Sequence, residues 1–102
     1  MLIDLDPQAN TTSGMGVNPR RLEKSIYEML IGQAPIESVI KKTNFLSLHL
    51  LPSSSRLAGA RIELVNMPRR ELRLKELLEP IRKHYDFIII DSPPSLDLLT
   101  VN

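Results

Sequence analysis

The 102-residue chain contains no cysteine and no tryptophan, and aromatic residues make up only 4% of it. Without cysteine it can form neither a disulfide framework nor a thiolate metal site, and two histidines are too few for a zinc site. Thirteen Lys and Arg against twelve Asp and Glu leave a formal charge of +1, which excludes a strongly basic nucleic-acid module. No uncharged stretch approaches the ~20 residues that cross a bilayer, so we expect a soluble, cytoplasmic protein without a membrane segment.

The hydrophobic share of 42% is enough for one small core and too high for a disordered chain. We therefore expect a single domain over residues 1–102. An apolar run begins at the first residue, and the chain ends at Asn102 without a polar tail. These ends predict that the domain is incomplete and is the middle part of a longer chain.

Three apolar runs predict strands, at residues 1–5, 46–50 and 87–90. The third run is continuous and β-branched, which is typical of a strand buried on both faces. Between the first two strands, residues 9–17 are rich in turn formers and predict a loop, part of which could open a helix.

Helices are expected in the segments that separate the strands. One has a cap at Ser25 and a stop at Gly32, and a second starts at Pro35 and ends near Lys41 and Lys42. A third follows residues 53–55 with an apolar stripe to residue 65, and a long amphipathic helix covers residues 69–84 with a bend at Pro80. Strands separated by helices imply right-handed crossovers, and therefore an α/β fold with a parallel sheet of about three strands.

Acidic residues close two of the predicted strands. Asp4 and Asp6 come at the end of the first strand, and Asp91 comes at the end of the third. Ligands bind beyond the carboxyl ends of strands in parallel sheets, so neighbouring strands would bring these acids to one site that suits Mg²⁺. From the spacing alone, solvated turn residues are an equally good interpretation, since Asp-Pro commonly opens a turn.

Two segments resemble a known family. Residues 2–16, L-I-D-L-D-P-Q-A-N-T-T-S-G-M-G, are similar to the second nucleotide motif of the ParA/Soj chromosome- and plasmid-partitioning ATPases, the deviant Walker A group of P-loop proteins. Residues 85–96, Y-D-F-I-I-I-D-S-P-P-S-L, resemble their Walker B strand and switch II, and residues 50–64 match the usual connection. The resemblance implies part of the doubly wound parallel sheet of P-loop NTPases, with flanking helices.

The resemblance also implies roles for single residues. Asp6 corresponds to the acid that activates the attacking water, and Asp91 to the Walker B acid that holds Mg²⁺ through a water. Asp4 would support the same Mg²⁺ site through a water or through the residues that bind the metal. The first residues of switch II would be Pro93, Pro94 and Ser95.

The chain departs from the family at the phosphate-binding loop. No G-x-x-x-x-G-K-[ST] motif occurs in these residues, so no nucleotide-binding residue is assigned, and we expect the chain alone neither to bind ATP tightly nor to hydrolyse it. Intact members bind Mg-ATP between two subunits, respond to a ParB-type partner and bind DNA non-specifically. That DNA surface is not transferred to any residue here.

A second hypothesis is a non-enzymatic module. The family layout places the P-loop strand beside residues 87–90, so its absence would leave an apolar strand edge that can pair with an intact ParA-like subunit or a second copy. Membrane-associated and iron-sulfur-carrier relatives share both acidic motifs, but the Asp6-Pro7-Gln8 triplet favours the partitioning branch.

Overall fold

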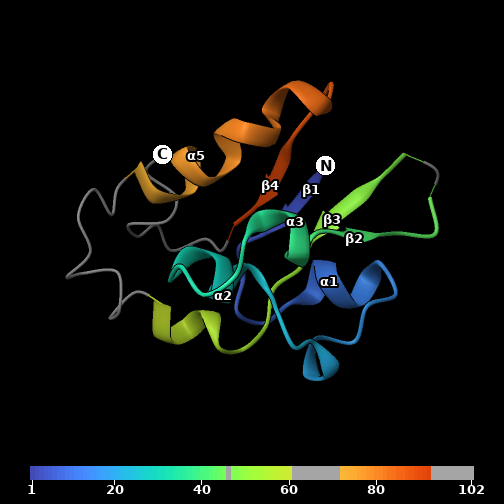
Figure 1. Cartoon of the computed structure of the whole chain (residues 1–102). Helices are drawn as coiled ribbons and strands as arrows, with labels where there is room; N and C mark the ends of the chain where they lie inside the picture. The colour runs from blue at the N-terminus through green and yellow to red at the C-terminus, as the bar shows by residue number, and fades with distance from the viewer. Residues whose placement is uncertain (46, 61–71, 93–102) are drawn as a thin grey trace.

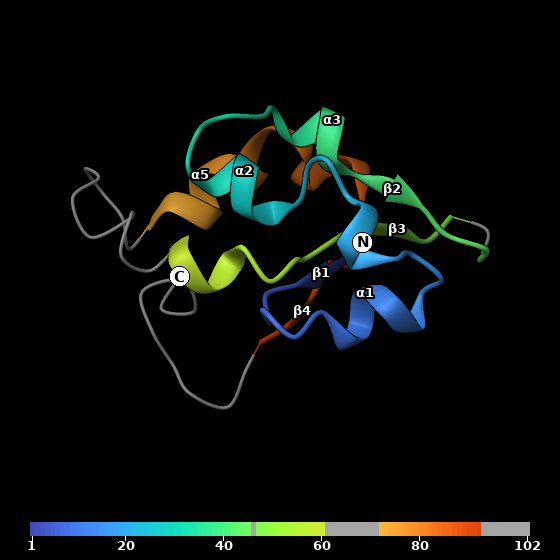
Figure 2. The same ribbon diagram turned by 90° about the horizontal axis from the view of Figure 1, so that it is seen from below.

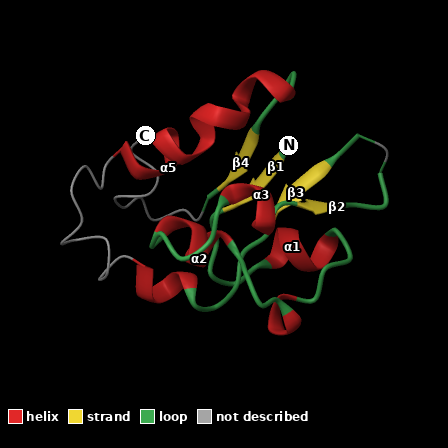
Figure 3. Ribbon diagram, viewed as in Figure 1, coloured by secondary structure: helices red, strands yellow, loops and turns green. Residues whose placement is uncertain are grey.

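A four-stranded sheet forms the centre of the molecule. The computed structural model describes residues 1–45, 47–60 and 72–92. The sheet has the order β2-β3-β1-β4 (Figures 1 and 3). β1 pairs in parallel with both β3 and β4, while β2 pairs antiparallel with β3. The predicted α/β fold is confirmed, with one short antiparallel strand added to the parallel ones. The strands are β1 (Leu2–Asp4), β2 (Lys41–Lys42), β3 (His49–Leu51) and β4 (Ile89–Asp91).

Short helices cover the two faces of this sheet. Figure 2 shows α2, α3 and α5 on one side of β1 and β4, and α1 on the other. In the described part of the chain, no helix has the length and apolar character needed to cross a membrane. The helices are α1 (Asn10–Gly14), α2 (Ile26–Leu30), α3 (Ile36–Val39) and α5 (Arg73–Leu78), with 3-10 helices η1 (Pro19–Arg21) and η3 (Glu79–His84), and residues 57–60 are also helical.

Local sequence signals set the bounds of α2 as predicted. Ser25 and Glu28 form a capping box, in which Glu28 Oε1 accepts from the Ser25 N–H at 2.7 Å and Ser25 Oγ accepts from the Tyr27 N–H at 3.2 Å. Gly32 follows the helix with a φ of 83°, the left-handed conformation that glycine adopts at low cost. Pro35 then precedes α3, as expected for a helix start.

The core lies between the sheet and the side that carries α2 and α5. Ile3 and Leu51 are register partners on β1 and β3, and both are fully buried. Each such side chain contributes about 1.5–3 kcal/mol through removal from water. The helices supply the other half of this core with Ile26, Met29, Leu30, Leu74 and Leu78.

Between the first strands, one segment folds as the sequence allowed and one prediction is wrong. Part of the turn-rich segment after Asp6 is helical: α1 lies where Asp4 on β1 accepts from the buried Thr12. The helix after Pro35 ends at Val39, and Lys41 and Lys42 form β2 because their backbone pairs with β3.

The other elements are displaced or less buried than expected. β3 begins at His49, because Ser47 has a φ of 65° and the Leu48 N–H bonds back to the Phe45 carbonyl in a turn. The prediction that residues 87–90 are buried on both faces is wrong: Phe87 is 79% exposed and Ile89 63%. Among the described strands β4 pairs only with β1, so little of the described chain covers it.

The long helix predicted from residue 69 is present in its described part. It runs as α5 and then tightens into η3 at Pro80, which occupies the first turn of that 3-10 helix. Leu46, residues 61–71 and the predicted switch residues Pro93, Pro94 and Ser95 lie outside the described residues.

Candidate functional site

The carboxyl ends of β1 and β4 lie side by side. Asp4 is the register partner of Asp91, and the Leu5 N–H donates to the Asp91 carbonyl at 2.8 Å. Since residues opposite each other in a parallel pair point to the same face, both acidic side chains leave the sheet toward α1. β1 and β4 are therefore neighbours, which is the condition on which the predicted site depends.

Asp4 is a fully buried carboxylate whose two oxygens are both occupied. Oδ1 accepts from the Asp6 N–H at 3.0 Å, and Oδ2 accepts from the Thr12 N–H at 2.9 Å and from Thr12 Oγ1 at 2.7 Å. Three donors compensate the cost of burying this charge. Asp4 therefore organises the backbone around it and does not present an oxygen to solvent.

Thr12 extends this network to the loop that follows β3. Its Oγ1 accepts from the Ser53 N–H at 2.9 Å, and Ser53 Oγ donates to the Asp6 carbonyl at 2.7 Å. Thr12 and Ser53 are both fully buried. Both backbone polar groups of Asp6 are thus held by side chains, the N–H by Asp4 and the carbonyl by Ser53.

The Asp6 side chain lies at the surface of this network and is partly exposed. Its Oδ1 accepts from the Gln8 N–H at 3.0 Å, which closes a turn around Pro7. The turn interpretation of Asp6 is correct, and it is compatible with chemistry. A carboxylate on a rigid backbone and open to water has what a general base requires.

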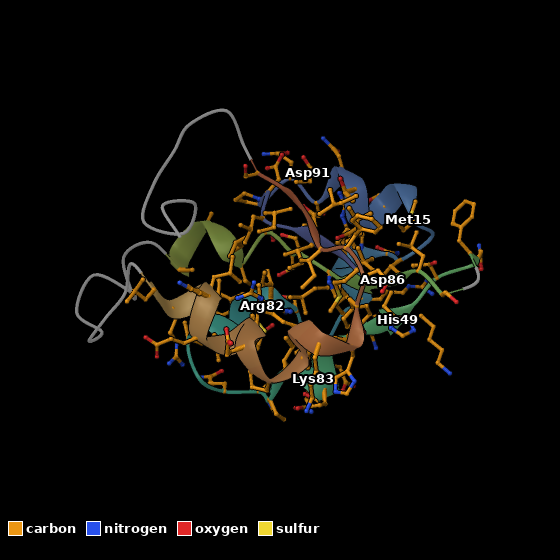
Figure 4. The ribbon with its side chains drawn as sticks, turned by 90° about the horizontal axis from the view of Figure 1, so that it is seen from above. Met15, His49, Arg82, Lys83, Asp86 and Asp91 are labelled. Carbon is orange, nitrogen blue, oxygen red and sulfur yellow. The ribbon has the colours of Figure 1, made fainter. Side chains whose placement is uncertain are left out.

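Asp91 is exposed and has a partner that sequence reasoning missed. Its Oδ2 accepts a hydrogen bond from the hydroxyl of Thr11, on α1. No pattern in the sequence points to this contact, because it joins residues that are 80 positions apart. Figure 4 shows Asp91 and Asp86 at opposite ends of the segment that contains β4.

The carboxylate oxygens at the ends of β1 and β4 are the kind of ligand that Mg²⁺ prefers, but they do not converge on one point. The part of the chain that the structure describes contains no group of three His, Cys, Asp or Glu residues able to hold a metal. Asp4 is turned toward Thr12, Asp6 toward Gln8 and Asp91 toward Thr11. Of the paired acids Asp4 and Asp91, only Asp91 is exposed. Its carboxylate suits a water-mediated contact to a metal, and the other ligands of that metal would come from outside these acids.

The histidine in the sheet packs against a tyrosine. His49 Nδ1 lies 2.7 Å from the Tyr85 hydroxyl, and the two rings meet edge to face with centroids 5.5 Å apart. Burial raises the pKa of the Tyr85 phenol above its usual value of 10.0. Asp91 and His49 lie at different ends of the sheet (Figure 4).

Comparison with known proteins shows which family the chain resembles. The family model described as an AAA domain matches residues 1–102. The sporulation initiation inhibitor protein Soj of Bacillus subtilis is 47% identical over all 102 residues, which cover 40% of its length. The chromosome partitioning protein ParA of Myxococcus xanthus is 44% identical, again over the whole chain and over 36% of its own length. The chain thus spans about two fifths of these relatives.

Solved structures give the same result. The chain superimposes with a TM-score of 0.93 and 39% identity on cobyrinic acid a,c-diamide synthase from Mycobacterium smegmatis with a bound ATP analogue and magnesium, covering 99% of this chain and 41% of that one. It matches a plasmid partition protein from Borrelia burgdorferi with a TM-score of 0.82 and 33% identity, covering 95% and 44% of the two chains. The chain therefore belongs to the AAA domain family, among the relatives of the ParA/Soj-type partitioning ATPases.

Proposed function

We propose that this chain supplies the acidic side of an ATP-hydrolysis site in a ParA-like partitioning ATPase. The observation that carries the proposal is the meeting of the carboxyl ends of β1 and β4, where Asp6 and Asp91 both reach solvent. The similar M. smegmatis structure holds an ATP analogue and magnesium, which supports the same ligands here. In the whole protein, Mg-ATP binding and hydrolysis would drive dimerisation and DNA segregation, with a ParB-type partner, in the cytoplasm.

In this proposal Asp6 is the catalytic residue. Its carboxylate accepts the proton of the attacking water or orients that water, a task that needs an ionised, accessible group in a fixed place. Asp4 and Ser53 hold the Asp6 backbone from both sides, which supplies that fixed place. Asp4 contributes to the metal site only through this support, because both of its oxygens accept protein donors.

Asp91 is the residue proposed to hold Mg²⁺, through a water. When bound, the metal neutralises negative charge on the phosphate groups. Asp91 contributes an exposed carboxylate at the end of β4, two positions before the first of the proposed switch residues, Pro93, Pro94 and Ser95. Nucleotide contacts of the phosphate-binding-loop type would come from outside these residues, which contain no such motif.

The test measures Mg²⁺-dependent ATP hydrolysis by the longest open reading frame that contains residues 1–102. Asp6→Ala should reduce the turnover rate by about 10²–10⁴-fold, the usual contribution of a general base, while ATP binding persists. Asp91→Ala should increase the Mg²⁺ concentration needed for half-maximal turnover.

Asp86→Ala is the matched control. Asp86 is also exposed and lies near the other end of β4, away from Asp91 (Figure 4). Its removal should leave both the rate and the Mg²⁺ requirement unchanged. Turnover that survives Asp6→Ala, or that falls equally in Asp86→Ala, would contradict the proposed site.

A second candidate is the non-enzymatic pairing module. The exposed apolar residues Phe87, Ile89 and Ile90 favour it, because strands with such a surface associate with other chains. Its test is the association state of the 102-residue chain.

A further inference from the structure

Helix α1 is joined to the two adjacent strands by consecutive threonines. Thr12 bonds Asp4 on β1, and Thr11 bonds Asp91 on β4. Successive side chains on a helix diverge by about 100°, so two neighbouring residues can reach two neighbouring strands. The Thr12 contact is buried and belongs to the network that supports Asp6, whereas the Thr11 contact is at the surface and has no part in the function proposed so far.

The two acids differ in how firmly they are held. Asp4 accepts three hydrogen bonds, but within the described residues the side chain of Asp91 accepts only the one from Thr11, on Oδ2. Without this donor, an exposed carboxylate would rotate freely about its side-chain torsions. The Thr11 hydroxyl therefore selects one orientation and leaves Oδ1 available.

We propose that Thr11 is a positioning residue for Asp91: its hydroxyl holds Oδ2 and leaves Oδ1 available for a water-mediated contact to the metal. The inference rests on the proposed function, in which Asp91 holds Mg²⁺. Partners of this kind behind a metal-binding carboxylate typically change metal affinity by about 10–100-fold when they are removed. A purely structural role, in which Thr11 only anchors α1, predicts a loss of stability instead.

Substitutions at Thr11 separate these roles. Thr11→Val keeps the shape and removes the hydroxyl, and Thr11→Ala removes it with a smaller side chain, while Thr11→Ser keeps it. Ser13→Ala is the matched control, since Ser13 is an exposed hydroxyl residue of the same helix with no side-chain hydrogen bond among the described residues.

The experiment uses the longest open reading frame that contains residues 1–102, with a non-hydrolysable ATP analogue and Mn²⁺. The free Mn²⁺ is measured by electron paramagnetic resonance, and the melting temperature is measured without metal. We expect Thr11→Val and Thr11→Ala to weaken Mn²⁺ binding by about tenfold, at an unchanged melting temperature. Thr11→Ser should restore the affinity, and Ser13→Ala should not alter it.

The outcomes distinguish this inference from the function on which it rests. If Asp91→Ala weakens Mn²⁺ binding but Thr11→Val and Thr11→Ala do not, the positioning role is overturned and the proposed metal site stands. It is also overturned if Thr11→Ser weakens binding as much as Thr11→Val. If Asp91→Ala leaves the Mn²⁺ affinity unchanged, the metal-holding role of Asp91 fails and this inference fails with it.

Discussion

The Thr12 hydroxyl donates to the carboxylate of Asp4 at 2.7 Å, and both residues are fully buried. The same oxygen of Thr12 accepts from the Ser53 N–H, so one hydroxyl joins β1, α1 and the loop after β3. Thr12→Val would leave a buried backbone N–H without its acceptor and a buried carboxylate with one donor fewer. We expect it to lower the free energy of unfolding by about 3 kcal/mol, the sum of these two losses.

Chemical denaturation followed by circular dichroism checks this value. Thr12→Ser keeps the hydroxyl and should lose less than half as much. A loss of under about 1 kcal/mol in Thr12→Val, too small for an orphaned buried group, would show that water replaces the hydroxyl and that the network is not closed.

Sequence patterns predicted the features of this fold that depend on local chemistry. The capping box of Ser25 and the stop at Gly32 involve residues a few positions apart, so their effect can be judged without knowing the fold. The positions of Asp4 and Asp91 at strand ends follow from apolar runs in the same way. These signals were sufficient to predict the α/β order and the end of the sheet where the candidate site lies.

The features that sequence reasoning missed depend on distant partners. The composition of residues 9–17 left open how much of that segment is helical, and α1 forms where Thr12 bonds Asp4 on β1. The two lysines of β2 have no apolar alternation and form a strand only by pairing with β3. The Thr11 contact to Asp91 spans 80 positions, so no spacing rule could find it. The exposure of β4 depends on what else packs beside it, which a β-branched run does not reveal.

Ser47 offers a test of backbone strain. It is an exposed residue with a φ of 65° in the turn between β2 and β3, a conformation that costs a residue with a Cβ about 1–2 kcal/mol. Glycine has no such cost but loses more entropy on folding, so we expect Ser47→Gly to raise the free energy of unfolding by about 0.5–1 kcal/mol. Ser47→Ala, which keeps the Cβ, should be close to neutral. Equal midpoints of urea denaturation for both variants would argue against strain at this turn.

Tyr85 predicts a loss of stability in alkaline solution. Burial raises the pKa of its phenol in the folded protein, so the folded state binds the proton more tightly than the unfolded state does. This contribution is fully present below the unfolded value of 10.0 and is lost as the pH rises through the folded pKa. Denaturation curves recorded across this pH range should show the decline.

Tyr85→Phe isolates this contribution from the titration of lysines, which also occurs at high pH. The variant should be less stable than the parent at neutral pH, because His49 loses its hydrogen-bond partner. Above pH 10 the difference between the two proteins should shrink. A constant difference at all pH values would mean that the phenol titrates alike in the folded and unfolded chains.

The exposed surface of β4 predicts self-association of the 102-residue chain. Ile89 lies on this strand and is 63% exposed, and Phe87 just before it is 79% exposed. Among the described strands β4 has β1 as its one neighbour, so it presents apolar side chains next to an open strand edge. Lysine on such a strand opposes pairing through charge, so Ile89→Lys should shift the chain toward the monomer in sedimentation velocity runs over a wide concentration range.

Phe45→Lys is the control for this experiment. Phe45 is 60% exposed, but it lies between β2 and β3. Figure 1 shows that the far ends of these two strands point away from β4. Association through β4 should therefore persist in Phe45→Lys and decline in Ile89→Lys. If both lysines reduce it equally, general hydrophobic contact is the cause, and if the parent chain is monomeric at every concentration, β4 does not act as a pairing surface.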